Sequence, residues 1–162
     1  MVDVVSQEKR SRIMGSIRGR NTKPEIALRS GLHRLGLRFS LRSKLPGRPD
    51  ITLPRHRTVV FFHGCFWHGH EGCALFRLPK TRPEFWRDKI EANRERDARV
   101  LNELAALRWR IAVVRECSIR GSLRRELSDI CLELADWIRG GDDAFMEISG
   151  WVGAEPVGDV TP

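Results

Sequence analysis

Residues 57–76 read Arg-Thr-Val-Val-Phe-Phe-His-Gly-Cys-Phe-Trp-His-Gly-His-Glu-Gly-Cys-Ala-Leu-Phe, a strand-like run followed by the most informative segment of the sequence. Its first six residues are rich in β-branched and aromatic side chains, which predicts a buried strand. The strand leads into a loop, and residues 61–76 gather three histidines, two cysteines and an adjacent Phe-Trp pair. Metal-type side chains beside aromatic residues in a polar, glycine-containing loop indicate a site of chemistry.

Elements on both sides of this strand predict a mixed α/β fold. Thr22-Lys-Pro-Glu25 is typical of a capping box with proline in the first turn, and Gly36 ends the helix that follows. Strands are expected at residues 37–41, 50–53 and 110–115, helices at 84–107 and 123–138, and a loop at 63–83. This order indicates one domain with a small central mixed β-sheet flanked by helices.

Charge is unevenly distributed along the 162 residues, whose net charge is +8. Residues 1–48 carry twelve basic and three acidic side chains, whereas residues 141–162 carry five acidic and no basic ones. We therefore expect a basic arm at 1–20, a folded domain at 21–140 and an acidic, flexible tail at 141–162. A basic surface suits nucleic acid. No apolar run approaches the roughly 18–20 residues of a membrane span, and without a secretory signal the expected location is the cytoplasm.

Cysteines and histidines in the loop have the spacing of metal ligands. Disulfides are not expected without a secretory signal. The three candidate ligands in the loop are Cys65, His70 and Cys73. A structural zinc site needs four sulfur or nitrogen ligands, and Cys117, at the end of a predicted strand, is the best fourth candidate, with His63 and His68 as competitors. Cys131 fits a buried core position. The alternative is a set of free thiols and surface imidazoles.

Asp50 follows the turn at residues 46–49 and begins a short strand beside the strand at 57–62. Two adjacent strands would bring its carboxylate near main-chain carbonyls, and such hard oxygen ligands suit Mg²⁺. Mg²⁺ would stabilise charge on a scissile phosphate and orient a water, and His68 or His63 could deprotonate that water. A turn-capping carboxylate is an equally good interpretation of Asp50 from its spacing.

The long helix predicted at 84–107 has an inward apolar stripe that Asn93 and Asp97 interrupt. A polar pair on an inner face requires polar or metallic partners, unless the start of the helix overhangs the sheet and the pair is solvated. Three aromatic residues, Phe66, Trp67 and Trp86, could insert between base pairs beside a basic surface. Aromatic residues in a zinc loop also often cover the metal or fill the core.

Taken together, these segments closely resemble the Vsr family of very-short-patch-repair mismatch endonucleases. The matching segments are Pro46-Gly-Arg-Pro-Asp50, His63-Gly-Cys-Phe-Trp-His68, Thr81-Arg-Pro-Glu-Phe-Trp86, Glu95-Arg-Asp97 and Glu116-Cys117, in order over residues 8–140. The resemblance implies a fold akin to type II restriction endonucleases, with a structural zinc. It also implies an enzyme that nicks double-stranded DNA 5′ of the T in T:G mismatches, which arise when 5-methylcytosine deaminates.

The resemblance further implies roles for individual residues. Mg²⁺ would be bound by the Asp50 carboxylate and the Phe62 main-chain carbonyl, with His68 as the base for the attacking water. Glu25 and Asp97 would hold water molecules that are bound to the metal. His63 would support the site by contacting the scissile phosphate. The zinc ligands would be Cys65, His70, Cys73 and Cys117. The intercalating residues would be Phe66, Trp67 and Trp86, with the basic arm along the duplex.

Double-stranded DNA with a T:G mismatch is then the expected partner, with other mismatch-repair proteins as candidate further partners. We expect a monomer, because one active site cuts one strand. Two rival interpretations remain. One is a related endonuclease with a different target preference. The other is a non-catalytic, zinc-stabilised DNA-binding module, whose DNA binding would be indifferent to Asp50→Ala and which would not nick DNA with Mg²⁺.

Overall fold

The computed structural model describes residue 8 and residues 21–150. Apart from residue 8, the arm predicted at 1–20 lies outside the described residues, as do residues 151–162 of the predicted tail. The described helices are α2 (Lys23–Arg34), α3 (Pro83–Ala106) and α4 (Leu127–Gly140), with short 3-10 helices at Pro54–His56 and Glu116–Ser118. The described strands are β1 (Ile51–Leu53), β2 (Thr58–His63), β3 (Arg110–Arg115) and β4 (Phe145–Ile148).

The described strands form one mixed sheet in the order β1-β2-β3-β4. β1 and β2 make an antiparallel hairpin in which Ile51 lies opposite Val60. β2 pairs with β3 in parallel, and β3 with β4 in parallel. The connection from β2 to β3 contains the metal-type loop and α3. The predicted mixed sheet flanked by helices is confirmed.

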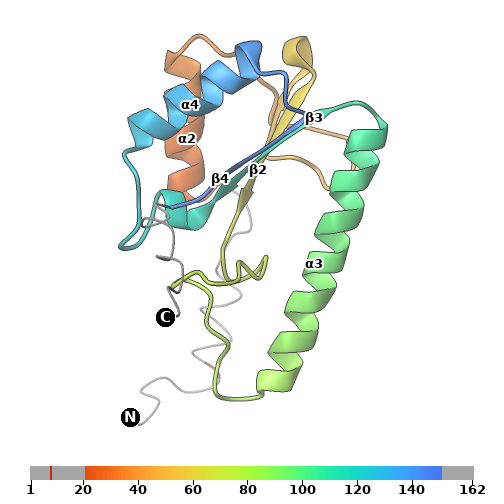
Figure 1. The fold of residues 1–162 in the computed structure, drawn as a ribbon, viewed down its shortest axis with the longest axis vertical. Helices are drawn as coiled ribbons and strands as arrows, with labels where there is room; N and C mark the ends of the chain where they lie inside the picture. Colours follow the sequence, from red (N-terminus) through yellow and green to blue (C-terminus); the bar gives the residue numbers. More distant parts are fainter. Residues whose placement is uncertain (1–7, 9–20, 151–162) are drawn as a thin grey trace, which may run out of the picture.

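Helices cover both faces of the sheet, with α2 and α4 on one face and α3 on the other (Figure 1). Because successive side chains of a strand point to opposite faces, the strands contribute to two cores. The larger core, beneath α2 and α4, includes Leu28, Leu32, Val60, Val114, Ile130 and Leu134. The smaller core, beneath α3, consists of Val59, Phe61, Leu104, Ile111 and Val113.

α3 is longer than the sheet it covers. Its 24 residues span about 36 Å, whereas the six residues of β3 span about 20 Å. Leu104, near the end of the helix, packs on the sheet, so the first half of α3 projects beyond the sheet beside the loop at 64–82 (Figure 1). This overhang gives the loop a helix to pack against.

Three parts of the fold differ from expectation. Residues 37–41 form only an isolated bridge from Ser40 to Thr52, and the guanidinium of Arg38 donates to the carbonyls of His33 and Leu37. α4 starts at residue 127 rather than 123, because the residues before it form turns. β4 lies within the segment assigned to a flexible tail, so the folded domain continues past residue 140, through the parallel pairing of β4 with β3.

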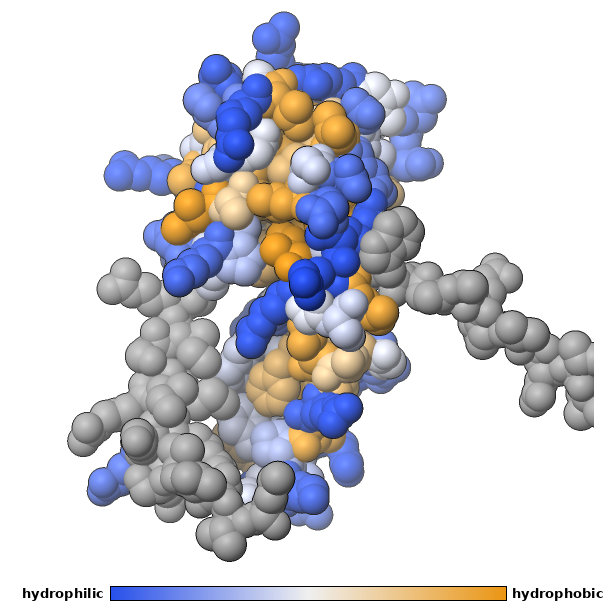
Figure 2. All heavy atoms as spheres, turned by 90° about the vertical axis from the view of Figure 1, so that its left-hand side faces the viewer, coloured by the Kyte–Doolittle hydropathy of each residue, from blue (hydrophilic) through white to orange (hydrophobic). Residues whose placement is uncertain are grey.

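The outer face of α2 and α4 carries apolar side chains between hydrophilic ones (Figure 2). Leu132 on α4 and Ile26 on α2 are both exposed. The apolar character of this face is therefore discontinuous. Among the described residues, no helix combines the length and apolar character needed to cross a membrane.

Candidate active site and metal cluster

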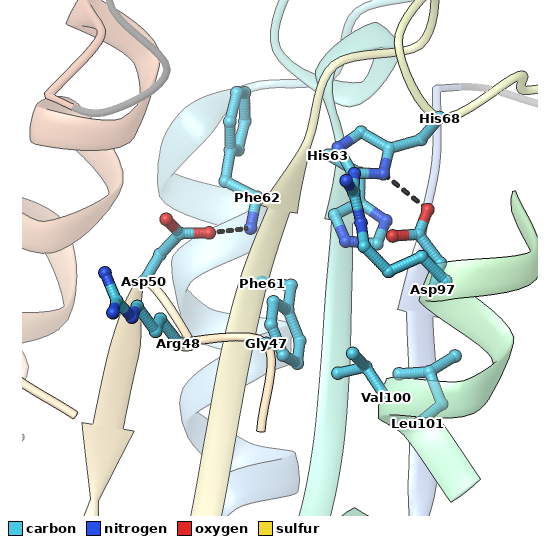
Figure 3. A pocket seen from close by; sticks show the side chains of 11 residues that line it. Gly47, Arg48, Asp50, Phe61, Phe62, His63, His68, Asp97, Val100 and Leu101 are labelled. Carbon is cyan, nitrogen blue, oxygen red and sulfur yellow. Dashed lines mark hydrogen bonds and ion pairs between the residues drawn. The ribbon is translucent and has the colours of Figure 1, made fainter. Parts of the chain in front are cut away.

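A cavity of about 650 Å³ opens where β2 ends, between the β1–β2 hairpin and α3 (Figure 3). The end of the strand, the loop that follows it and the overhanging helix each contribute side chains. Five residues predicted to belong to a catalytic site line this one cavity: Asp50, Phe62, His63, His68 and Asp97. The structure therefore brings together groups that lie up to 47 residues apart in the sequence.

Asp50 lies just before β1, and its carboxylate reaches the end of β2. Its Oδ2 accepts a hydrogen bond from the main-chain N–H of Phe62 at 2.7 Å. Pro49, the residue before it, is buried, which fixes where the turn delivers Asp50. The Asp50 carboxylate therefore caps the main chain of the neighbouring strand from inside the cavity.

Two histidines and a carboxylate form a compact group on the α3 side of the cavity. The rings of His63 and His68 stack with centroids 3.7 Å apart and an angle of 2° between their planes. Burial, and then the neighbouring His68, lowers the pKa of His63 to about 3, so His63 is neutral at neutral pH. The Nδ1 of His68 lies 2.6 Å from Oδ2 of Asp97. This group could also hold a metal ion.

The contact with Asp97 fixes the tautomer of His68. Burial opposes ionisation of Asp97, but the hydrogen bond and charge of His68, with smaller contributions from His63 and Arg96, together outweigh burial and lower the pKa of Asp97. An ionised carboxylate only accepts hydrogen bonds, so Nδ1 of His68 carries the proton in this contact. When His68 is neutral, its Nε2 then has a free lone pair.

The polar interruption of the α3 stripe has the polar partners that the sequence predicted. Asp97 bonds to His68, and the side-chain amide of Asn93 donates to the main-chain carbonyl of Trp67 at 2.9 Å. Both partners belong to the loop that packs on the overhang. The helix does overhang the sheet, as the alternative interpretation supposed, but Asn93 and Asp97 bond to the loop and are not merely solvated.

Glu25 lies on α2, away from the histidines. The Thr22 side chain caps the helix by accepting from the Glu25 N–H at 3.4 Å, as predicted, and the Glu25 carboxylate is buried in an ion pair with Arg29. Glu25, Arg29 and Asp50 line a second cavity of about 170 Å³. Asp50 lies at the border of both cavities, so Glu25 is adjacent to the main cavity without lining it.

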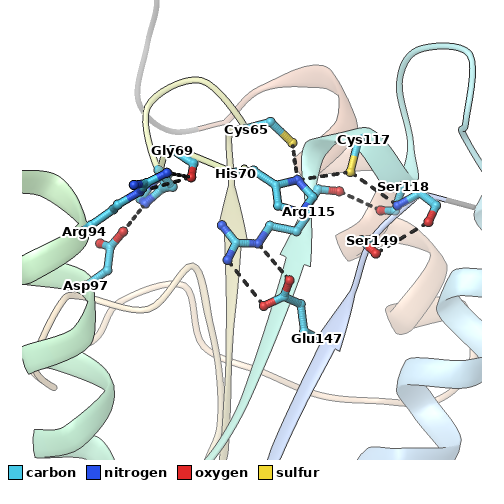
Figure 4. A network of polar contacts seen from close by, with 12 residues as sticks. Cys65, Gly69, His70, Arg94, Asp97, Arg115, Cys117, Ser118, Glu147 and Ser149 are labelled. Carbon is cyan, nitrogen blue, oxygen red and sulfur yellow. Dashed lines mark hydrogen bonds and ion pairs between the residues drawn. The ribbon is translucent and has the colours of Figure 1, made fainter. Parts of the chain in front are cut away.

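The four predicted metal ligands converge at a separate place. One ligand atom from each of Cys65, His70, Cys73 and Cys117 lies within 4.8 Å of the others. The Nδ1 of His70 is 3.5 Å from Sγ of Cys65 and 3.6 Å from Sγ of Cys117 (Figure 4). All four cysteines are free thiols. Three sulfurs and one imidazole nitrogen match a closed tetrahedral zinc site, so this cluster could hold a metal.

Residues outside the cluster fix its ligands. The N–H of Cys65 donates to the carboxylate of Glu116 at 3.1 Å, and the N–H of Gly150 donates to Sγ of Cys117 at 3.3 Å. Burial raises the pKa of both Cys65 and Cys117, so these thiols are protonated without a metal. Cys131 stands apart, buried in the larger core, as the sequence predicted.

The three predicted intercalating residues form one aromatic cluster on the overhang. Ring centroids are 5.1 Å apart for Phe66 and Trp67, 5.6 Å for Phe66 and Trp86, and 6.0 Å for Trp67 and Trp86. The ammonium of Lys89 lies 5.6 Å from the Trp67 ring centroid and 5.7 Å from that of Trp86. The cluster combines large apolar rings with a cation.

Sequence reasoning missed two basic residues of the main cavity and two members of the aromatic cluster. Arg48 and Arg96 line the cavity, and Phe85 and Lys89 join the aromatic rings. The available signal was helical spacing, since Lys89 follows Trp86 by three residues and Phe85 by four, on one face of α3. Arg48 was visible within the turn at 46–49 but was assigned only to the turn.

Comparison with known proteins identifies the family of the chain. The family described as DNA mismatch endonuclease Vsr matches residues 2–74. The type II nicking enzyme V.XorIIP of Xanthomonas oryzae is 51% identical over 133 residues, which cover 80% of this chain and 97% of the relative. The DNA mismatch endonuclease Vsr of Escherichia coli is 44% identical over 154 residues, covering 93% and 97%. The type II nicking enzyme V.NmeAIP of Neisseria meningitidis is 38% identical over 139 residues, covering 84% and 99%.

These similarities, together with the fold and the cavity, define a DNA endonuclease. The chain belongs to the Vsr family of DNA mismatch endonucleases.

Proposed function

We propose that the protein nicks double-stranded DNA 5′ of the T in T:G mismatches that arise from deamination of 5-methylcytosine, and so begins very short patch repair. The observation that carries the proposal is the convergence of Asp50, His68 and Asp97 on one cavity, next to the aromatic cluster. Membership of the Vsr family supports the same reaction class.

Asp50 and the main-chain carbonyl of Phe62 are the proposed Mg²⁺ ligands. In an antiparallel pair, the N–H and C=O of one residue face the same partner strand. The Phe62 N–H bonds to Asp50, so we expect its carbonyl to face the Asp50 side as well. Two hard oxygens at one place suit Mg²⁺, which would supply positive charge to the scissile phosphate and orient a water. Glu25 and Asp97 would hold ordered water beside these ligands.

His68 is the proposed general base. Asp97 keeps the proton on Nδ1 of His68, which leaves Nε2 to accept a proton from the water that attacks phosphorus. Positioning of a histidine by a carboxylate has this effect in other hydrolases. His63 stacks on His68 and is neutral, so it can donate a hydrogen bond to the scissile phosphate without adding a second charge beside the base.

The four-ligand cluster is proposed to bind a structural zinc. Its ligands Cys65, His70 and Cys73 lie in the loop that also delivers His68, whereas Cys117 follows β3. Zinc would tie this polar loop to the sheet, which the loop cannot achieve by apolar packing. We also infer a relationship to the type II restriction endonuclease-like fold, supported by the small mixed sheet with an acidic residue at its hairpin.

The aromatic cluster is proposed to recognise the mismatch. Unstacking neighbouring base pairs costs a few kcal/mol per step, and stacking of bases on Phe66, Trp67 and Trp86 would offset this cost. A T:G wobble pair is weaker than a Watson–Crick pair, so opening the stack beside it costs less. Lys89, next to the rings, would place positive charge near the distorted backbone.

A nicking assay tests the proposal directly. The substrate is a duplex with one T:G mismatch and each strand labelled, incubated with and without Mg²⁺, beside a matched T:A duplex and the Asp50→Ala variant. We expect one Mg²⁺-dependent nick 5′ of the mismatched T, which Asp50→Ala abolishes. Cleavage at another mismatch would indicate a related endonuclease with a different target, and DNA binding without any nick would indicate a non-catalytic module.

A further inference from the structure

The loop at residues 41–48, here called the basic loop, lies beside the catalytic cavity and has no assigned role. Between Glu25 and Asp50 the sequence contains six lysines and arginines and no acidic residue. Three of the six belong to the basic loop, namely Arg42, Lys44 and Arg48, and all three side chains are exposed. Charge of one sign therefore accumulates immediately before the proposed metal ligand Asp50.

The basic loop lines a hollow that continues from the catalytic cavity. The hollow has a volume of about 530 Å³, and its lining includes Arg42, Lys44, Gly47 and Arg48. Gly47 and Arg48 also line the catalytic cavity. Anything that extends from the catalytic cavity past these two residues meets Arg42 and Lys44 next.

The basic loop is held in place at both ends. Ser40, just before it, exchanges main-chain hydrogen bonds with Thr52 of β1 at 2.8 and 2.9 Å. Near its other end, a Cβ built on Gly47 would lie 2.4 Å from a methyl of Val100 on α3, and the φ of Gly47 is +72°. Only glycine fits this conformation and this close approach, so the loop is pressed against the helix.

Serine side chains order the loop between these anchors. The Ser40 hydroxyl donates to the Arg42 carbonyl at 2.9 Å and accepts from the Arg42 N–H at 3.2 Å. The Ser43 hydroxyl accepts from the Leu45 N–H at 3.1 Å. Such side-chain bonds fix the backbone before any ligand arrives, so ordering the loop costs less on binding.

Two of the loop's cations, Arg42 and Lys44, are exposed and are not neutralised by described acidic side chains. No ion pair joins Arg42 or Lys44 to a described acidic residue, whereas arginines elsewhere, such as Arg94 and Arg115, pair with glutamates. An ordered loop with two exposed cations beside the catalytic cavity suits an anionic ligand.

We propose that the basic loop binds the phosphates adjacent to the scissile phosphate on the strand that is cut. This inference rests on the proposed nicking function, which places the scissile phosphate in the catalytic cavity. The strand that enters the cavity leaves past Gly47 and Arg48, and Arg42 and Lys44 contact its next phosphates. The loop thereby fixes the register of the cut strand, while base recognition remains with the aromatic cluster.

The test compares the double variant Arg42→Gln/Lys44→Gln with the control Arg55→Gln/Arg108→Gln. The control removes the same charge from exposed positions at the opposite end of β1 and β2. Each phosphate contact contributes about 0.9 to the slope of log affinity against log salt. We therefore expect the loop variant to lower the slope by about 2, so that between 50 and 200 mM salt its affinity for duplex DNA falls about tenfold less than that of the wild type. The control and the charge-retaining Arg42→Lys/Lys44→Arg should keep the wild-type slope.

A second measurement locates the contact. Single neutral methylphosphonate linkages replace the phosphates of each strand in turn around the nick site. Wild-type binding should weaken at linkages adjacent to the scissile one on the cut strand, and the loop variant should be insensitive to the same linkages. An unchanged salt slope, equal sensitivity of both proteins, or an effect confined to the uncut strand would overturn the inference. If the wild type binds through the loop but never nicks, the proposed function fails and the loop remains a DNA contact.

Discussion

Replacing Asp97 with asparagine should prevent His68, the proposed general base, from accepting a proton while leaving its side chain in place. The carboxylate of Asp97 lies 2.6 Å from Nδ1 of His68, and both side chains are about one-fifth exposed, so water competes weakly for this bond. An amide can donate to Nδ1, which would move the proton of His68 to Nε2. The nitrogen that faces the attacking water would then be a donor rather than an acceptor.

The expected loss in nicking rate equals the rate contribution of a general base. Such a base contributes about 10²- to 10⁴-fold to rate, so Asp97→Asn should raise the activation barrier by about 3 to 5 kcal/mol. The assay is single-turnover nicking of the labelled T:G duplex at saturating enzyme, so that binding does not limit the rate. Glu95→Gln provides the matched control, because Glu95 is exposed on the same helix. It should nick at the wild-type rate.

A double-variant cycle tests whether Asp97 acts through His68. If it does, adding Asp97→Asn to His68→Ala should cost little beyond the loss from His68→Ala alone, because residues that act as a unit are not additive. Additive losses, or a loss below threefold for Asp97→Asn alone, would refute the reasoning. Thermal unfolding of each variant must match the wild type for the comparison to stand.

Three further outcomes are expected. Trp67→Ala should reduce the preference for T:G over matched duplexes, measured as a ratio of affinities, more than it reduces binding to matched DNA; equal losses would remove its role in recognition. The zinc affinity of the metal-stripped protein should rise with pH, and zinc binding should release protons, because the raised pKa values of Cys65 and Cys117 keep their thiols protonated. Competition with a chelator measures the affinity, and a pH indicator measures the released protons. An affinity that does not change with pH would contradict this prediction. Leu134→Ala, at a fully buried position, should lower the free energy of unfolding by about 2 to 5 kcal/mol in urea denaturation while nicking well below the melting temperature is unchanged.

Local patterns predicted the elements whose signals were strong. The strand at 110–115 has the expected bounds, and α3 differs from its expected range by one residue at each end. The strand is a run of apolar and β-branched residues between two arginines, and the helical spacing of apolar residues in α3 continues on both sides of Asn93 and Asp97. The polar pair on α3 also predicted that polar or metallic partners lie against it, because unpaired polar groups on an inner face are costly.

Long-range pairing was not predictable in the same way. β4 is four residues long, and its burial comes from β3, which is some thirty residues earlier in the chain. Leu37 and Phe39 pack on the larger core while Leu41 is exposed, and the segment forms no ladder, because Ser40 alone pairs with β1. The candidate metal ligand Cys117 could be predicted from its place after a strand, whereas the hydrogen bond that Gly150 donates to it depends on the pairing of β4 with β3.

The hydrogen bond from Gly150 to Cys117 has a consequence for how the protein is made. The ribosome synthesises every proposed catalytic residue, metal ligand and aromatic wedge before it reaches β4 and Gly150. A nascent chain therefore contains every proposed catalytic residue while the Cys117 thiol still lacks the hydrogen bond from Gly150 and the sheet lacks its edge strand β4. Activity should consequently appear only after β4 and Gly150 have been synthesised. Premature stop codons at residues 142–144, which leave α4 intact, should yield products that neither retain zinc nor nick DNA.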